Sequence, residues 1–417
     1  MKHAAPRILI LTASVGAGHI RAAEAVELAL KELAPDAHVK NVDLMTCATP
    51  IFRRMYSKWY LDLVSRAPHL LGYFYDLTDR APTNSRRDRF RLMVERANLT
   101  KLDPILHDPQ GWDIVVNTHF LPAEIIARLR RKKKWPNRSQ LGARHSALST
   151  APVPQYTVVT DFDAHGLWAN WGGDPTDRYF VATEEAAISL GRWGVPREIV
   201  TITGIPIHPV FAAAKDPREM RRAHNLPPDR PVILLLAGGF GVGPIEHLFE
   251  AALRVEHPGG IHLIVVCGKN EALKKKLEQR ARALAAASRP RHSAPGTRHS
   301  TTILGFTRQM DELMAAADIV VSKPGGLTTS EILARGAAMA IVNPIPGQES
   351  RNSDYLLENG AAIKINSAAV LPHKLNQLLA NPSRLAALRE NARALGHPRA
   401  AFDVAEAVLR AVGGAEP

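Results

Sequence analysis

The sequence has little cysteine and no long apolar run. Its 417 residues include only Cys47 and Cys267, which lie far apart and lack the spacing of metal ligands. We therefore predict a protein of a reducing compartment, the cytoplasm, without a cysteine-built metal site. No stretch reaches the roughly 18 apolar residues that a membrane span needs, and the apolar run at 7–13 is too short for a signal peptide. These features argue against a secreted or an integral membrane protein.

Acidic residues are scarce relative to basic ones, 40 against 53, which gives a net charge of +13. The excess is local, because residues 130–150 contain seven lysines and arginines and no acid, and residues 288–300 contain three and no acid. These segments hold ten of the thirteen net charges, so we do not expect nucleic acid as a partner. They have two open interpretations: solubilising loops, or segments attracted to an anionic membrane surface.

The first half of the chain begins with a strand, turn and helix pattern that is typical of nucleotide-binding folds. We predict an apolar strand at 7–13, a glycine-rich turn at 14–19 and a helix at 20–33. The glycines do not match the full dinucleotide fingerprint, so this turn alone is weak evidence. Gly18 and His19 would approach a ligand there. A histidine just inside a helix N-terminus is favoured in its neutral form, which suits a general base, although a surface or capping role is the alternative.

Polar side chains follow two later strands of the first half. The strands predicted at 112–117 and 155–160 end close to His119, Asp161 and His165. Open α/β sheets bind ligands at the carboxyl ends of their strands, so these three residues are candidates for the acceptor side of a cleft. Each of them could instead cap a loop or a helix.

Residues 51–77 have the most unusual composition, with seven of the 24 aromatic residues of the chain. Tyr56 and Trp59 belong to an aromatic stripe at helical spacing with basic residues nearby. Such a stripe most simply forms part of a core. Beside exposed basic residues it would also make an interfacial helix, which would shape the entry for a lipid acceptor at a membrane.

The second half alternates strands and helices after a polar, proline-containing stretch at 212–230, which we predict to link two domains. A strand at 232–236 runs into a turn whose backbone N–H groups suit an anion. This turn contains Gly238, Gly239, Gly241 and Gly243. It lacks the Lys-Ser/Thr ending of a P-loop, which argues against a metal-dependent NTPase. A strand at 302–306 would place Phe306 near a nucleotide base.

One stretch near the end of the chain points to a nucleotide-sugar. An apolar run leads into a glycine-rich turn that opens a helix, and such a helix N-terminus binds phosphate while a nearby carboxylate binds a ribose. The candidate donor-binding residues are Pro324, Gly325, Gly326, Leu327, Thr328 and Glu331, with Gln348 and Glu349 in a second polar loop. Thr328 and Glu331 also match the T-x-x-E pattern of a capping box, which is the structural alternative for Glu331.

Taken in order, these motifs resemble glycosyltransferase family 28. Within it, the chain is most similar to the branch of monogalactosyldiacylglycerol synthases and bacterial diacylglycerol glucosyltransferases. The resemblance covers nearly the whole chain and is carried by Gly16-Ala17-Gly18-His19, Gly204-Ile205-Pro206-Ile207, the glycines at 238–243, and Lys323-Pro324-Gly325-Gly326 with Gln348-Glu349.

The resemblance implies an α/β GT-B fold, with two Rossmann-like, doubly wound domains that face each other across a cleft. The implied parts are an acceptor-binding domain at 1–212, a UDP-sugar domain at 213–398, and a helix at 399–417 that returns to the first domain.

The resemblance also implies an inverting transfer of a hexose from a UDP-sugar to a lipid hydroxyl. His19 would be the base, Phe306 would lie near the uracil and Glu331 at the ribose. The glycine-rich turns would face the diphosphate, and Gln348 and Glu349 would face the sugar hydroxyls. No metal or other cofactor is implied. The enzyme would be peripheral, on the inner face of the cell membrane.

Other functions stay open at this point. The acceptor could be a different lipid, such as a lipid A or polyprenyl intermediate. A UDP-sugar epimerase would use the same fold, but it needs no lipid, so the aromatic segment argues against it. A non-enzymatic polyanion-binding protein is disfavoured by the local distribution of charge. The sugar is undetermined, because Gln348 and Glu349 can hydrogen-bond either C4 epimer.

Overall fold

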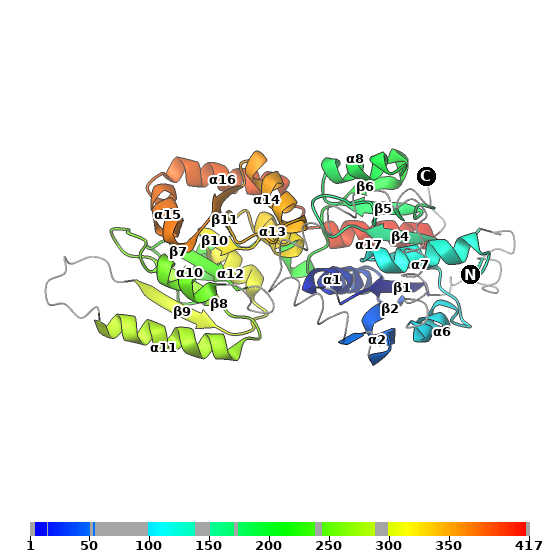
Figure 1. Cartoon of the computed structure of the whole chain (residues 1–417), viewed down its shortest axis with the longest axis horizontal. Coiled ribbons are helices and arrows are strands. Elements are labelled where there is room, and N and C mark those ends of the chain that lie inside the picture. The colour runs from blue at the N-terminus through cyan, green and yellow to red at the C-terminus, as the bar shows by residue number, and fades with distance from the viewer. Residues whose placement is uncertain are drawn as a thin grey trace. The chain divides into compact units, whose positions relative to one another are not determined.

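The chain folds into two compact units (Figure 1). The first unit contains residues 1–209, 346–348 and 399–417, and the second contains residues 210–345 and 349–398. Each unit is built on one six-stranded parallel sheet. The computed structural model describes residues 5–14, 16–50, 53–54, 99–137, 151–170, 174–237, 244–287 and 299–413.

The sheet of the first unit has the strand order β2-β1-β3-β4-β5-β6. Every residue of β1 is buried, so both faces of the sheet are covered, as expected for parallel strands. β1 pairs with β2 on one side and β3 on the other. The strand order therefore reverses between β1 and β3, and such a switch point is where open α/β sheets bind ligands. The strands are β1 (Arg7–Thr12), β2 (His38–Asp43), β3 (Ile114–Asn117), β4 (Gln155–Val158), β5 (Arg178–Val181) and β6 (Val200–Ile202).

Helices cover this first sheet. Leu9 and Leu11 of β1 pack with Leu121 and Ile126 of α7 in one apolar core. The last helix, α17, lies against α1 and β3, so the end of the chain completes the first unit. The helices are α1 (Ala17–Leu33), α2 (Leu44–Cys47), α6 (Asp103–Leu106), α7 (Phe120–Arg131), α8 (Glu184–Arg192) and α17 (Ala400–Val412).

The sheet of the second unit has the strand order β12-β11-β10-β7-β8-β9. β7 pairs with β8 on one side and with β10 on the other, so the switch point lies between β7 and β10. The two glycine-rich turns of the sequence follow these two strands. The strands are β7 (Val232–Leu236), β8 (His262–Val266), β9 (Ser300–Leu304), β10 (Ile319–Ser322), β11 (Ala338–Val342) and β12 (Ala362–Ile365).

The helices of the second unit pack on this sheet and on one another. Phe249 of α10 and Leu375 of α15 are fully buried in the same core as Ile233 and Leu235 of β7. The helices are α9 (Pro217–Ala223), α10 (Ile245–Ala252), α11 (Glu271–Ala287), α12 (Met310–Ala316), α13 (Gly326–Arg335), α14 (Gln348–Glu358), α15 (Leu371–Leu379) and α16 (Pro382–Leu395).

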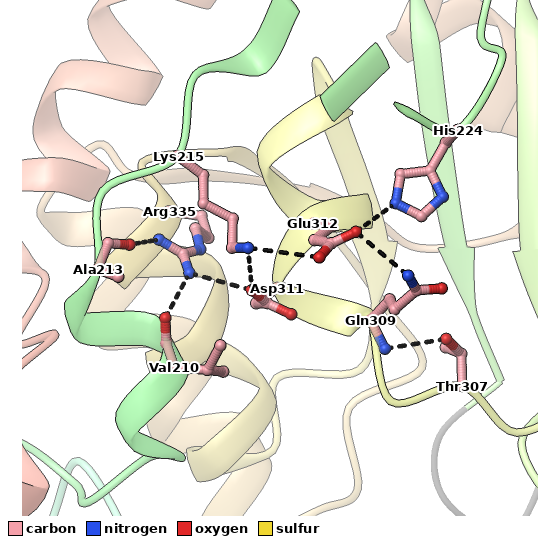
Figure 2. A network of polar contacts seen from close by, with 9 residues as sticks. All are labelled: Val210, Ala213, Lys215, His224, Thr307, Gln309, Asp311, Glu312 and Arg335. Atoms are coloured by element: carbon pink, nitrogen blue, oxygen red, sulfur yellow. Dashed lines mark hydrogen bonds and ion pairs between the residues drawn. The ribbon is translucent and has the colours of Figure 1, made fainter. Parts of the chain in front are cut away.

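The stretch 212–230 is not the simple linker that the sequence predicted. It contains helix α9, which packs against α12. Asp216 caps this helix by accepting a hydrogen bond from the backbone N–H of Glu219. Pro217 is the first residue of the helix, a position where proline is favoured because no backbone N–H is needed. Just after α9, His224 Nε2 lies 2.8 Å from the carboxylate of Glu312 in α12 (Figure 2). The proline that suggested a linker therefore starts a helix.

Candidate active site

His19 lies in the first turn of α1, directly after β1. Gly16 precedes the helix with a φ of 94°, a conformation that favours glycine, and no side chain caps the helix. The ring nitrogen Nδ1 of His19 lies 3.0 Å from the carbonyl oxygen of Thr118 and 2.8 Å from Oγ1 of Thr160. The hydroxyl of Thr118 donates to the carbonyl oxygen of His19 at 3.0 Å. The end of β3 therefore holds both the backbone and the side chain of His19.

A cluster of rings surrounds His19 at the carboxyl ends of β1, β3 and β4. The ring of His119 lies edge-on to that of His19, with centroids 4.6 Å apart. Trp168 lies 6.1 Å from His19 and 6.0 Å from His165. Phe120 lies 4.2 Å from His119 and 5.7 Å from His165. His119 and His165, predicted from strand ends, and His19, predicted from the glycine-rich turn, thus belong to one cluster.

The remaining acceptor-side candidates fall close to this cluster or outside the described residues. Gly18 precedes His19 in α1, and a Cβ on it would meet no atom of the described residues within 4 Å. Asp161 follows Thr160 and is only 2 % exposed. Tyr56 and Trp59 lie outside the described residues, so the predicted aromatic stripe has no structural account here.

Burial favours the neutral form of His19 and of His119. It lowers the pKa of His19 to about 4, opposed by the hydrogen bond to the carbonyl of Thr118. Burial also lowers the pKa of His119 well below its usual value, with a further contribution from His19 and His165. The expected neutrality of His19 is present, but burial is its main cause, whereas the sequence argument used the helix dipole.

His119 also has the capping role that was its structural alternative. It is the N-cap of α7, and its Nδ1 accepts a hydrogen bond from the backbone N–H of Leu121 at 3.1 Å. This bond fixes the ring beside His19. The side chain of His119 therefore both caps α7 and belongs to the ring cluster.

Sequence reasoning missed Thr160, Phe120 and Trp168 as members of this site. Thr160 was read as the last residue of a strand, although β4 ends at Val158. Its place just before Asp161, at a strand end next to the switch point, is the signal that could have found it. The aromatic side chains carry no such signal, because a buried Phe or Trp after a strand usually belongs to a core.

The second group of candidates lies where β10 leads into α13. Gly325 is the N-cap of α13, with extended backbone (φ −68°) and no side-chain capping bond, and Gly326 is the first helical residue. The capping box that was the structural alternative for Thr328 and Glu331 is not formed, because the helix begins before Thr328. Glu331 lies in the second turn and is 5 % exposed, so capping does not explain this carboxylate.

Glu349 approaches the start of α13 from α14. Its Oε2 accepts a hydrogen bond from the backbone N–H of Ile345 at 2.8 Å, and its Oε1 lies 3.7 Å from the position that a Cβ on Gly325 would occupy. Burial raises the pKa of this carboxyl, opposed by the Ile345 bond and by Lys323. Gln348 and Glu349 begin helix α14, which corrects the polar loop expected there.

The donor-side candidates differ in their surroundings. Pro324 and Leu327 are buried, and the carbonyl oxygen of Pro324 accepts a hydrogen bond from the side-chain amide of Asn352 at 2.9 Å. Phe306 follows β9 and is 60 % exposed, which is unusual for an aromatic ring. Gly238, Gly239, Gly241 and Gly243 lie outside the described residues; β7, which leads into them, is at the switch point.

The part of the chain that the structure describes lacks both a metal-binding cluster and a membrane-spanning helix. It holds no group of three or more His, Cys, Asp or Glu side chains arranged to bind a metal ion. None of its helices combines the length and the apolar character required to cross a membrane.

Two family models match the chain in succession. Residues 19–207 match monogalactosyldiacylglycerol (MGDG) synthase, and residues 232–404 match the glycosyltransferase family 28 C-terminal domain. A processive diacylglycerol beta-glucosyltransferase of Bacillus pumilus is 30% identical over 390 residues, which cover 93% of this chain and 91% of that protein. The chain belongs to glycosyltransferase family 28. The enzyme of the same name from Bacillus subtilis is 28% identical over 97% of this chain and 95% of its own length.

Solved structures share the fold of this family 28 protein at low sequence identity. Anabaena HepE in complex with UDP has a TM-score of 0.54 at 12% identity, and MurG of Acinetobacter baumannii has 0.53 at 16%. UDP-GlcNAc 2-epimerase of Neisseria meningitidis, bound to UDP-GlcNAc, has 0.55 at 14%. Each comparison covers 97% of this chain and 99% of the other. The fold is GT-B, and because transferases and an epimerase both share it, the fold alone does not select the reaction.

Proposed function

We propose that this protein is an inverting hexosyltransferase that moves a hexose from a UDP-sugar to the hydroxyl of diacylglycerol or of a glycosyl-diacylglycerol, in glycolipid synthesis. The observation that carries the proposal is the neutral His19 at the switch point of the first sheet, whose Nδ1 lies 3.0 Å from the carbonyl oxygen of Thr118. The relatives named as diacylglycerol glucosyltransferases support the choice of acceptor.

His19 acts as the general base in this scheme. It takes the proton of the acceptor hydroxyl as the oxygen attacks the anomeric carbon from the face opposite the diphosphate. The bond from that carbon to the diphosphate oxygen breaks, and UDP leaves with the electron pair. One displacement of this kind inverts the anomeric configuration. A base that is neutral at physiological pH is ready for this step without first losing a proton.

The donor lies at the start of α13. The backbone N–H groups at Gly325 and Gly326 have no side chain of their own residue beside them. No side chain of the described residues caps the start of the helix. These groups and the helix dipole stabilise the negative charge of the leaving UDP, so the reaction needs no metal or other cofactor. The glycine turn at 238–243 and Thr328 also face the diphosphate. Phe306 stacks on the uracil, Glu331 binds the ribose, and Gln348 and Glu349 bind the sugar hydroxyls.

The acceptor lies at the ring cluster of the first unit. His119 and His165, with Gly18 and the buried Asp161, line its polar part. Tyr56 and Trp59 of the aromatic segment guide the acyl chains. The enzyme is cytoplasmic and binds the inner face of the cell membrane, where its basic segments meet anionic lipid headgroups.

The reaction is tested with labelled UDP-glucose, UDP-galactose and UDP-GlcNAc, each with and without diacylglycerol in anionic vesicles. A labelled lipid that forms only with diacylglycerol supports the proposal, and the productive donor identifies the sugar. His19→Asn should abolish the product, whereas His373→Asn, an exposed histidine of α15, should not. Conversion of the UDP-sugar without any lipid product would instead indicate an epimerase.

The ribose role of Glu331 has a separate test. Because the capping explanation has failed, Glu331→Gln should weaken UDP binding at least tenfold, measured by calorimetry, with a small effect on unfolding. Glu390→Gln changes an exposed glutamate of α16 and is the control. Unchanged UDP affinity in Glu331→Gln would remove this residue from the donor site.

A further inference from the structure

His19 Nδ1 has two oxygen neighbours of different chemistry. The carbonyl oxygen of Thr118, at 3.0 Å, can only accept a hydrogen bond, whereas Oγ1 of Thr160, at 2.8 Å, can donate or accept. The carbonyl contact is satisfied only if Nδ1 carries the hydrogen. We infer that Thr118 and Thr160 together hold neutral His19 in its Nδ1–H tautomer, which leaves the lone pair on Nε2, and that Thr160 is a positioning residue for the base.

The opposite tautomer is disfavoured by this geometry. With the hydrogen on Nε2, the lone pair of Nδ1 would face the lone pairs of the Thr118 carbonyl, and only the Thr160 hydroxyl could compensate by donating. With the hydrogen on Nδ1, this N–H donates a bifurcated hydrogen bond to the carbonyl oxygen of Thr118 and to Oγ1 of Thr160. Nε2 makes no hydrogen bond within the described residues, so it is the nitrogen available to a substrate hydroxyl.

The two oxygens also act after proton transfer. When Nε2 has taken the proton, the ring is charged, and its Nδ1–H still donates to the same two oxygens. Hydrogen bonds to the charged form raise the pKa of a base such as histidine, as the Thr118 contact does for His19. Thr160 therefore orients the lone pair before the reaction and stabilises the imidazolium that the reaction forms.

The position of Thr160 makes this contact rigid. Thr160 is 6 % exposed and follows β4, the strand next to β3. Thr118 follows β3, and its own hydroxyl binds the backbone carbonyl of His19. Three consecutive strands of the sheet thus set the orientation of one imidazole ring, which a single flexible loop would not do.

The inference rests on the proposed role of His19 as the base, but its first test does not. Histidine labelled with ¹⁵N in the full chain reports the protonated ring nitrogen directly, and His19→Asn identifies the His19 signals. We expect Nδ1–H in the wild type and an increased share of Nε2–H in Thr160→Val. A wild-type ring protonated at Nε2 would overturn the inference whatever the enzyme transfers.

The second test measures transfer. Thr160→Val should lower kcat about tenfold with the KM for UDP-sugar unchanged, since one hydrogen bond to the base is lost. Thr160→Ser keeps the hydroxyl and should restore most of the rate and the Nδ1–H signal, which a packing defect would not allow. If Thr160→Val kept both the wild-type rate and the wild-type tautomer, Thr160 would have no positioning role.

Thr157→Val is the matched control. Thr157 lies within β4, shortly before Thr160, is fully buried, and its hydroxyl has no partner among the described residues. The same change of side chain there should leave the tautomer and kcat as in the wild type. If His19→Asn retained full transfer while the ¹⁵N spectra showed Nδ1–H, the proposed base would be wrong, and so would the positioning role of Thr160.

Discussion

The guanidinium of Arg335 lies 3.5 Å from the carboxylate of Asp311, and both side chains are nearly buried, with 5% and 4% exposed (Figure 2). Arg335 ends α13, the helix whose start we assign to the diphosphate. It also donates to the carbonyl oxygens of Ala213 at 2.6 Å and Val210 at 3.0 Å. Lys215 shares the carboxylate of Asp311 at 3.1 Å. This network ties the first residues of the second unit to α13.

Arg335→Lys should destabilise the second unit by roughly 3 kcal/mol, because a lysine cannot reproduce the planar set of donors that binds the Ala213 and Val210 carbonyls and Asp311 together. All six tryptophans precede residue 194, so tryptophan fluorescence reports the first unit, whereas far-UV circular dichroism reports both. In urea, the circular dichroism transition should gain an earlier phase while the fluorescence transition stays in place. Arg384→Lys, an exposed arginine of α16, should change neither. Equal shifts of both signals would contradict a local effect.

The acid limb of the pH–rate profile should lie near the low pKa of His19. Burial places that pKa at about 4, so transfer should stay constant as pH falls from neutrality to about 5.5 and then decline. The unfolded chain, with its ordinary histidine pKa of about 6.5, binds the proton first. The stability contribution of neutral His19 is therefore complete above about 6.5 and is lost as pH falls toward 4.

The measurement is kcat/KM against pH at fixed vesicle composition, with circular dichroism confirming that the protein is folded at each pH. His19→Asn should flatten the decrease in unfolding free energy between neutrality and pH 4. An acid limb at the ordinary histidine pKa would show that the ring is solvated during turnover.

Lysines at the end of α7 should contribute to membrane binding. Lys132, Lys133 and Lys134 are exposed, with Lys133 in a left-handed turn (φ 53°), whereas Arg130 is held by Asp177 at 2.6 Å. Each basic residue near an anionic surface contributes about 1 kcal/mol, so reversing the three lysines to glutamate should weaken binding to anionic vesicles about hundredfold. Vesicle sedimentation measures this change.

The control reverses the same number of charges elsewhere. Lys275, Lys276 and Arg282 are exposed on α11 of the second unit, and changing them to glutamate produces the same net charge. This variant should keep most of the vesicle binding. Equal losses in the two variants would indicate that only net charge matters and that the end of α7 is not a contact surface.

The sequence predicted the strands well because parallel strands buried on both faces are short, continuous apolar runs. β7 was predicted at its observed bounds, 232–236. The strand-end rule selected His119 and His165, and the glycine-rich turn selected His19. The three lie in one cluster, since parallel strands share one carboxyl edge.

The errors came from local patterns with two physical meanings. Proline at 217 is typical both of a loop and of the first turn of a helix. The N-cap hydrogen bond of Asp216 stabilises the helix here. The T-x-x-E pattern at Thr328 occurs inside a helix that Gly325 had already begun, and glycine is a weaker cap signal than threonine. The contact between Thr160 and His19 joins residues 141 apart in sequence, and no local pattern encodes its distance.

Substitution of the two glycines that flank α13 should affect two different properties, UDP affinity at Gly325 and the free energy of unfolding at Gly336. Among the described residues, a Cβ on Gly325 would meet only Oε1 of Glu349, at an ordinary 3.7 Å, and the φ of −68° at this position suits any residue. Gly325→Ala should therefore change the unfolding free energy by less than about 0.5 kcal/mol. If α13 holds the diphosphate as proposed, the new methyl group would face it, and UDP binding measured by calorimetry should weaken at least tenfold.

Gly336→Ala is the reciprocal variant at the other end of the same helix. Gly336 has a φ of 57°, and a Cβ there would overlap the side chain of Arg393. We expect a loss of about 1–2 kcal/mol in unfolding free energy, from the left-handed conformation and the displaced arginine. UDP affinity should be unchanged at temperatures where the protein is folded. If Gly325→Ala bound UDP as tightly as Gly336→Ala, the first turn of α13 would not hold the diphosphate, and the donor site would have to lie elsewhere on this sheet.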